Sequence, residues 1–130
     1  MTETPAPPGH YPGRAPIDAY GNGGFRFAGM SHKGSIIALP SGVWAWDAGD
    51  PASLTAPVLT KVFGEPRGGE FQFLLLGTGT AQVFPPLELR RAFMESGLGL
   101  EVMSTGAACR TYNVLLAEGR PVGAALIAVG

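Results

Sequence analysis

The sequence predicts a single α/β domain, a layered structure in which an N-terminal β meander precedes a βαβαβ C-terminal half forming a mixed, largely parallel sheet. The chain has 130 residues, of which 45% are hydrophobic, enough for one domain core. Its last 60 or so residues alternate between strand-like and helix-like patterns. Residues 1–24 hold ten of the chain's 32 Gly and Pro. We therefore expect a flexible Pro/Gly-rich arm over 1–16 and the domain over 17–130.

Short β-type runs follow the expected arm. Glycines within 21–24 predict a loop, and the aromatic and β-branched residues from Phe25 to Trp46 then fall into three runs. Gly, Ser and Pro predict breaks at Ser31–Gly34 and at Pro40–Gly42. We expect a strand meander here. Its exposed edge offers a route to a homodimer, because unpaired strand edges template pairing.

A helix start is predicted at Asp50-Pro51, with Asp as the N-cap and Pro at the first helical position. Apolar residues then recur at intervals of four from Leu54 to Val62, as on one face of a helix. Pro57 interrupts this pattern, because proline lacks an amide and collides with the preceding turn. Either the helix kinks at Pro57 or it begins at about Ala56.

The C-terminal half reads as strand, helix, strand, helix, strand. These segments are a buried run over 70–76, a helix opened by Pro85-Pro86 and stopped at Gly97, a strand over 98–103, a helix capped by Thr105 that runs to Gly119, and an apolar strand over 122–129. Such alternation implies crossover connections and parallel neighbouring strands.

Composition and charge disfavour several classes of protein. Nine Lys and Arg against ten Asp and Glu give a net charge of −1, too little to hold a nucleic acid or an anionic bilayer. No run approaches the roughly 20 apolar residues of an integral membrane segment. The first 30 residues lack a secretory or mitochondrial leader pattern, and Cys109 has no disulfide partner. We expect a cytoplasmic protein.

No catalytic or metal-binding group stands out. Cys109 near a helix start could be a nucleophile, but the two histidines are His10 in the arm and His32 in a predicted turn. Cys109 is therefore interpreted as a small core residue. Two histidines and one cysteine are too few for a structural zinc site, which needs four ligands. We expect no metal and no cofactor.

One region could bind a ligand or a partner. A Gly-rich turn follows a buried strand, where α/β sheets bind ligands, but it lacks the third Gly of a dinucleotide fingerprint and the Lys of a P-loop. A structural tight turn is the favoured interpretation. Polar residues in the last helix are poor mid-helix choices unless their side chains have partners. Either they hydrogen-bond this turn, or together with it they bind a small anion or a partner; the candidates are Gly77, Thr78, Gly79, Thr80, Arg110, Thr111 and Asn113.

Several motifs together resemble a known family. They are Phe25-Arg26-Phe27, Gly77-Thr78-Gly79, Pro86-Leu87-Glu88-Leu89-Arg90, Glu101-Val102-Met103-Ser104-Thr105 and the block Ala108–Leu115. This is similar to the small uncharacterised-domain family that includes mitochondrial respiratory complex I assembly factor three and its bacterial relatives. The resemblance covers about residues 17–128, and Ala108–Leu115 is its most specific part.

The resemblance implies a layered α/β fold and a non-catalytic role in the assembly of NADH:quinone oxidoreductase, respiratory complex I. It implies protein partners, either peripheral-arm subunits of the complex or another assembly factor, and no catalytic residues carry over. Because no transit peptide is evident, we expect a bacterial member, cytoplasmic or peripheral to the inner membrane. The alternative is a small-molecule or anion-binding protein, or an enzyme, with its site between Gly77–Thr80 and Arg110 or Asn113.

Overall fold

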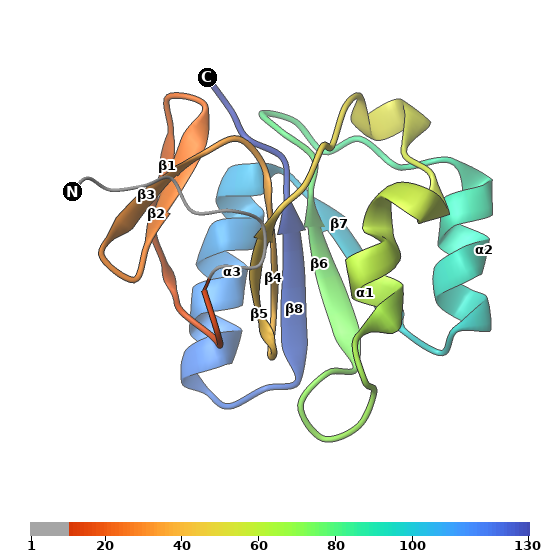
Figure 1. Cartoon of the computed structure of the whole chain (residues 1–130). Coiled ribbons are helices and arrows are strands. Elements are labelled where there is room, and N and C mark those ends of the chain that lie inside the picture. Colours follow the sequence, from red (N-terminus) through yellow and green to blue (C-terminus); the bar gives the residue numbers. More distant parts are fainter. Residues whose placement is uncertain (1–10) are drawn as a thin grey trace.

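The computed structural model describes residues 11–130, which form two sheets and the helices that cover them (Figure 1). The smaller sheet is antiparallel and has the order β1 (Ile17–Gly21), β2 (Gly24–Phe27) and β3 (Met30–Lys33). Asn22 and Ala28, both with φ of 51°, form its hairpin turns, each followed by a glycine at positive φ. The prediction of a break at Ser31–Gly34 is therefore wrong for residues 31–33, which belong to β3. The chain has already turned at Ala28, and His32 lies on a strand rather than in a turn.

The larger sheet has the order β5-β4-β8-β6-β7. Strand β6 pairs in parallel with β7 and with β8, whereas β4 pairs antiparallel with β5 and with β8. The mixed α/β architecture is thus confirmed, and the meander is divided between the two sheets. The bounds of these strands are β4 Ile36–Leu39, β5 Gly42–Ala45, β6 Phe73–Gly77, β7 Gly99–Met103 and β8 Val122–Leu126.

Helices cover both faces of the larger sheet. Figure 1 shows α3 (Thr105–Ala117) on one face, beside the smaller sheet, and α1 (Thr60–Gly64) and α2 (Leu87–Glu95) on the other. Two 3₁₀ turns, η1 (Pro51–Ser53) and η2 (Ala56–Leu59), precede α1.

The helix starts follow local capping chemistry. The Asp50 carboxylate accepts a hydrogen bond from the Ala52 amide at 3.0 Å, so the start predicted at Asp50-Pro51 is confirmed, although only a 3₁₀ turn follows. A second 3₁₀ turn starts at Ala56 and continues into α1 at Thr60, as in the second alternative for this segment. At the start of α3 the N-cap is Ser104 rather than Thr105, because the Ser104 hydroxyl accepts from the Ala107 amide at 3.3 Å.

The core lies in two layers on either side of β6 and β8. Leu75 packs with Tyr112 and Phe27 on the α3 face, while Leu74 and Leu76 pack with the helices of the opposite face. Alternate residues of a strand point to opposite faces, so a central parallel strand must be apolar on both. This is why residues 73–77 lack the alternation of a half-exposed strand.

Residues 11–15 pack against the folded body. The Val43 amide donates to the Tyr11 carbonyl at 3.0 Å, which places Tyr11 against the outer edge of β5. Arg14 donates to the Glu70 carbonyl at 2.6 Å, and Ala15 is buried. Of the arm expected over residues 1–16, residues 1–10 lie outside the described part of the chain, and the remainder packs against the domain.

Asn113 joins α3 to the smaller sheet. Its side-chain oxygen accepts from the Ile17 amide at 2.8 Å, and its nitrogen donates to the Ile17 carbonyl at 2.8 Å. The side-chain amide thus pairs with β1 as a neighbouring strand would. Such a pair of partners explains an asparagine in the middle of a helix, where its propensity is poor.

Replacing Asn113 by Ala should lower the free energy of unfolding by about 2 kcal/mol. Two hydrogen bonds disappear and the half-buried polar groups of Ile17 lose their partners, which outweighs the better helix propensity of Ala. Urea denaturation checks this. The adjacent exposed residue provides the control, since Val114→Ala should change stability by less than about 0.5 kcal/mol. Equal effects of the two substitutions would contradict the role of Asn113.

The end of β6 lies very close to the start of α3. A Cβ placed on Gly77 would lie 2.9 Å from the Thr105 Cα and 3.0 Å from the Leu126 Cδ2. We expect Gly77→Ala to destabilise the domain by about 1–3 kcal/mol, because backbone on one side and core on the other must shift. Thermal denaturation measures this. Gly64→Ala is the matched control and should be neutral or stabilising, because a Cβ there meets no atom within 4 Å.

Candidate functional site

The Gly77–Thr80 turn is held by Thr105, the first residue of α3. The fully buried Thr105 hydroxyl accepts from the Gly79 amide at 2.9 Å and donates to the Ile127 carbonyl at 2.7 Å. The Thr105 amide in turn donates to the Gly79 carbonyl at 2.8 Å. The amide and the carbonyl of Gly79 are therefore both hydrogen-bonded within the protein.

Thr78 is also hydrogen-bonded within the protein. Its hydroxyl donates to the Ala81 carbonyl at 2.6 Å and accepts from the Val83 amide at 2.9 Å. Its own amide donates to the Met103 carbonyl at 2.9 Å. These bonds shape the loop that leaves the sheet between β6 and α2, as a structural tight turn does. Thr80, the last residue of the turn, is exposed.

The three polar candidates of α3 lie in different surroundings. Asn113 binds Ile17, as described above. Arg110 is exposed near Gly106, at the end of α3 that Tyr20 contacts, and Thr111 faces a groove beside β7. The hydrogen bond expected from Asn113 to the Gly77–Thr80 turn is replaced by one to β1, because β1 packs along α3. A ligand between the turn and this helix stays a prediction.

Cys109 faces the core. Its side chain is 3% exposed, and burial raises the pKa of the thiol from 9.0 to about 11 despite the opposing charge of Arg110. The thiolate, which is the nucleophilic form, is therefore disfavoured at neutral pH. In the part of the chain that the structure describes, no three His, Cys, Asp or Glu side chains are placed to hold a metal ion.

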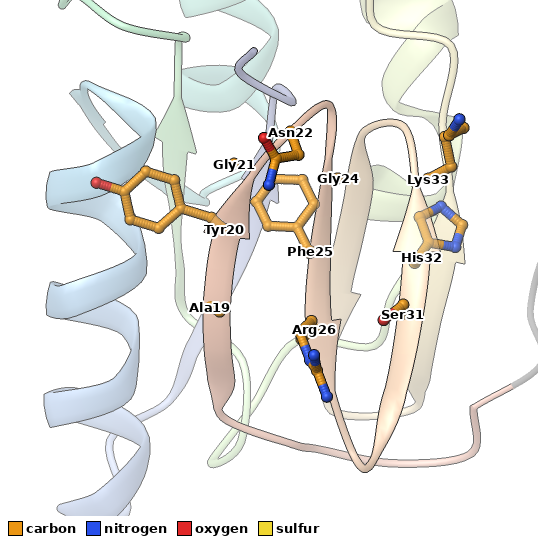
Figure 2. A pocket seen from close by; sticks show the side chains of 10 residues that line it. All are labelled: Ala19, Tyr20, Gly21, Asn22, Gly24, Phe25, Arg26, Ser31, His32 and Lys33. Carbon is orange, nitrogen blue, oxygen red and sulfur yellow. The ribbon is translucent and has the colours of Figure 1, made fainter.

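A hollow of about 400 Å³ lies at the smaller sheet (Figure 2). Arg26 from β2 and Lys33 from β3 are the cations that line it, with Ser31 and His32 between them in the sheet. Figure 2 shows the Arg26 and Lys33 side chains pointing away from each other, and Tyr20 reaching toward α3. An anion site requires cations that converge on one point, and Arg26 and Lys33 do not.

Two grooves flank the edge strand β7. We call the first, of about 380 Å³, the α3-side groove; it is lined by Phe73, Leu75, Glu101, Met103, Thr111 and Leu115, among others. The second, of about 500 Å³, is the α2-side groove; its lining includes Gln82, Phe84, Arg90, Met94, Leu100 and Val102. Both grooves are mostly apolar and share the strand between them.

Large apolar side chains are exposed around the α2-side groove. Met94 is 76% exposed, Phe84 61% and Leu87 50%. Phe84 and Met94 line this groove, and Leu87 lies on the same helix as Met94. Sequence reasoning missed it, although a signal was present: Leu89 and Phe93 face the core, so that Leu87 and Met94 fall off the buried stripe of the same helix.

Among residues 11–130, no helix combines the length and the apolar character that crossing a bilayer requires.

Comparison with known proteins gives consistent matches over most of the chain. A family described as a protein of unknown function (DUF498/DUF598) matches residues 17–127. An uncharacterised protein of Rhodobacter capsulatus is 39% identical over 124 residues, covering 95% of this chain and 91% of that protein. NADH dehydrogenase [ubiquinone] 1 alpha subcomplex assembly factor 3 of Mus musculus is 33% identical over 120 residues; the match covers 90% of this chain and 62% of the mouse protein.

A solved structure has the same fold. The crystal structure described as an outer membrane protein from Bartonella henselae superposes with a TM-score of 0.86 at 52% identity, covering 93% of this chain and all of that one. Sequence and structure thus agree over the whole of the domain described above. The chain belongs to the DUF498/DUF598 family, and its relatives include mouse and human proteins named NADH dehydrogenase [ubiquinone] 1 alpha subcomplex assembly factor 3.

Proposed function

We propose that this chain is a non-catalytic assembly factor that binds protein subunits during the maturation of an NADH:quinone oxidoreductase. The observation that carries the proposal is the 33% identity, over 85–90% of this chain, to mouse and human proteins named as complex I assembly factors. Its partners are then peripheral-arm subunits of that complex or a second assembly factor. The protein would act from the cytoplasm, at the inner surface of the membrane that holds the complex.

The surface supports a protein partner better than a small ligand. Exposed Phe84, Leu87 and Met94 provide apolar area that a partner can bury. The alternative, an anion bound between the Gly77–Thr80 turn and α3, has weaker support. Gly79, Thr78 and Asn113 already direct their polar groups at protein atoms.

Deleting the gene in its native host should lower the amount of assembled NADH:quinone oxidoreductase and its activity in membranes. A tagged copy should recover subunits of that complex, or a second assembly factor, from gently solubilised membranes. Native gels and mass spectrometry measure both effects, and succinate oxidation by the same membranes serves as the control. Normal NADH:quinone activity in the deletion strain, together with no recovered subunit, would sink the proposal.

The burial of Cys109 predicts an unreactive thiol. At pH 8 native Cys109 should react with iodoacetamide far more slowly than in urea, because it is buried and protonated. Between about pH 9 and 11 the unfolded thiol ionises before the folded one, so stability should fall as the pH rises. The stability of the Cys109→Ala variant should fall less steeply over this pH range. A residual decline should come from Tyr112, because burial raises its pKa to about 12. Equal alkylation rates in native and unfolded protein would contradict this prediction.

A further inference from the structure

We propose that the outer edge of β7 binds an extended segment of the partner polypeptide, which adds to the larger sheet as a sixth strand and places a Lys or Arg beside Glu101. This inference deepens the proposed function and rests on its claim that the chain binds a protein. It names the surface and the kind of segment that the surface accepts.

The direction of the β7 backbone groups follows from its bonds to β6. The Gly99 amide donates to the Gln72 carbonyl at 3.0 Å, and the Met103 carbonyl accepts from the Thr78 amide at 2.9 Å. Residues 99, 101 and 103 therefore face β6. Because successive residues of a strand alternate in direction, Leu100 and Val102 direct their N–H and C=O groups outward.

The outward groups are only partly occupied. The Gln82 side chain donates to the Val102 carbonyl at 2.8 Å. The amide and carbonyl of Leu100 and the amide of Val102 have no backbone partner among residues 11–130, since the described sheet ends at β7. The opposite edge of the same sheet, at β5, is covered at Val43 by Tyr11. Strand addition is therefore possible at the β7 edge.

The number of open groups suits a short pairing. In a parallel arrangement, one partner residue opposite Glu101 bonds both the Leu100 carbonyl and the Val102 amide. This pairing leaves the Gln82 bond to Val102 intact. An added strand would direct alternate side chains to the two sides of the sheet, where the α3-side and α2-side grooves lie. Both grooves are mostly apolar, so the segment should carry apolar residues on both faces.

Charge selects the partner. Glu101 is exposed between the two open backbone groups and has no salt bridge within residues 11–130. Arg120, which lines the same groove, pairs instead with Glu118, with 3.9 Å between the guanidinium nitrogen and the carboxylate oxygen. A cation opposite Glu101 would stabilise the pairing, and a carboxylate there would oppose it. A second copy of this chain, paired antiparallel about Glu101, would bring two such carboxylates together. The edge therefore favours a different chain that carries a basic residue.

The test compares three variants in the tagged protein recovered from native membranes. Val102→Pro removes an outward amide but no bond to β6, so it should abolish recovery of the partner while the domain stays folded. Glu101→Lys should reduce recovery by about 10-fold through like-charge repulsion. Asp18→Lys makes the same charge change at an exposed site on β1, in the other sheet, and should leave recovery unchanged. Thermal denaturation of each variant checks folding, and Glu101→Lys tests the inference even if Val102→Pro unfolds.

Hydrogen exchange supplies a direct readout. In the isolated chain the Leu100 and Val102 amides should exchange much faster than those of Glu101 and Met103, which face β6. In the recovered complex the Val102 amide should slow by about 100-fold, and the Leu100 amide should follow it if the partner strand runs antiparallel. A partner bound as a helix across a groove would leave the exchange at both positions unchanged.

The outcomes separate this inference from the proposed function. Recovery of oxidoreductase subunits, lost in Glu101→Lys and accompanied by protection of Val102, supports both. Subunits recovered equally with all variants, or without protection at either position, would overturn the β7 inference and leave the assembly role standing. A different protein held through β7 with the same variant pattern would support the inference and overturn the assembly role. No recovered protein at all would overturn the β7 inference, and together with normal NADH:quinone activity in the deletion strain it would overturn the assembly role as well.

Discussion

The constraint on which the fold depends is the burial of β6 and β8 on both faces. Leu74, Leu75 and Leu76 are all about 1% exposed or less, as is every residue that β8 contributes to the core. Such strands need cover on each side, because an open face would leave several leucine side chains in water at roughly 2 kcal/mol each. Helix α3 covers one face, α1 and α2 with the turn before α1 cover the other, and the smaller sheet packs beside α3.

The hydrophobic pattern was enough to predict most elements. Local periodicity predicts the buried run of β6, the amphipathic helix with Leu89 and Phe93, and the alternation that makes β6 parallel to β7 and β8. Turn positions were harder. Ala28 adopts a left-handed conformation that propensity does not favour, so the β2–β3 turn falls three residues before the predicted break.

The candidate site could be predicted only in part, because hydrogen-bond partners are a property of the tertiary structure. The poor helix propensity of Asn113 indicates that its side chain needs a partner, but not that the partner is Ile17, 96 residues away in sequence. Likewise, the turn after β6 has a sequence pattern compatible with ligand binding. In the structure the Gly79 amide instead donates to the Thr105 hydroxyl, a contact that the sequence does not reveal. Which strand ends a sheet depends on strand order, so the β7 edge had no sequence signal beyond the unexplained apolar residues Leu87 and Met94.

The same features that leave β7 open also limit what can bind there. An uncovered strand edge invites aggregation, and proteins limit this with short strands and charged side chains. Here the strand has five residues, Gln82 occupies one outward carbonyl, and Glu101 places a charge at its centre. These features disfavour indiscriminate pairing but not a short segment that supplies the opposite charge. Discrimination of this kind, in which one group repels wrong partners and attracts the right one, would give the proposed pairing its specificity.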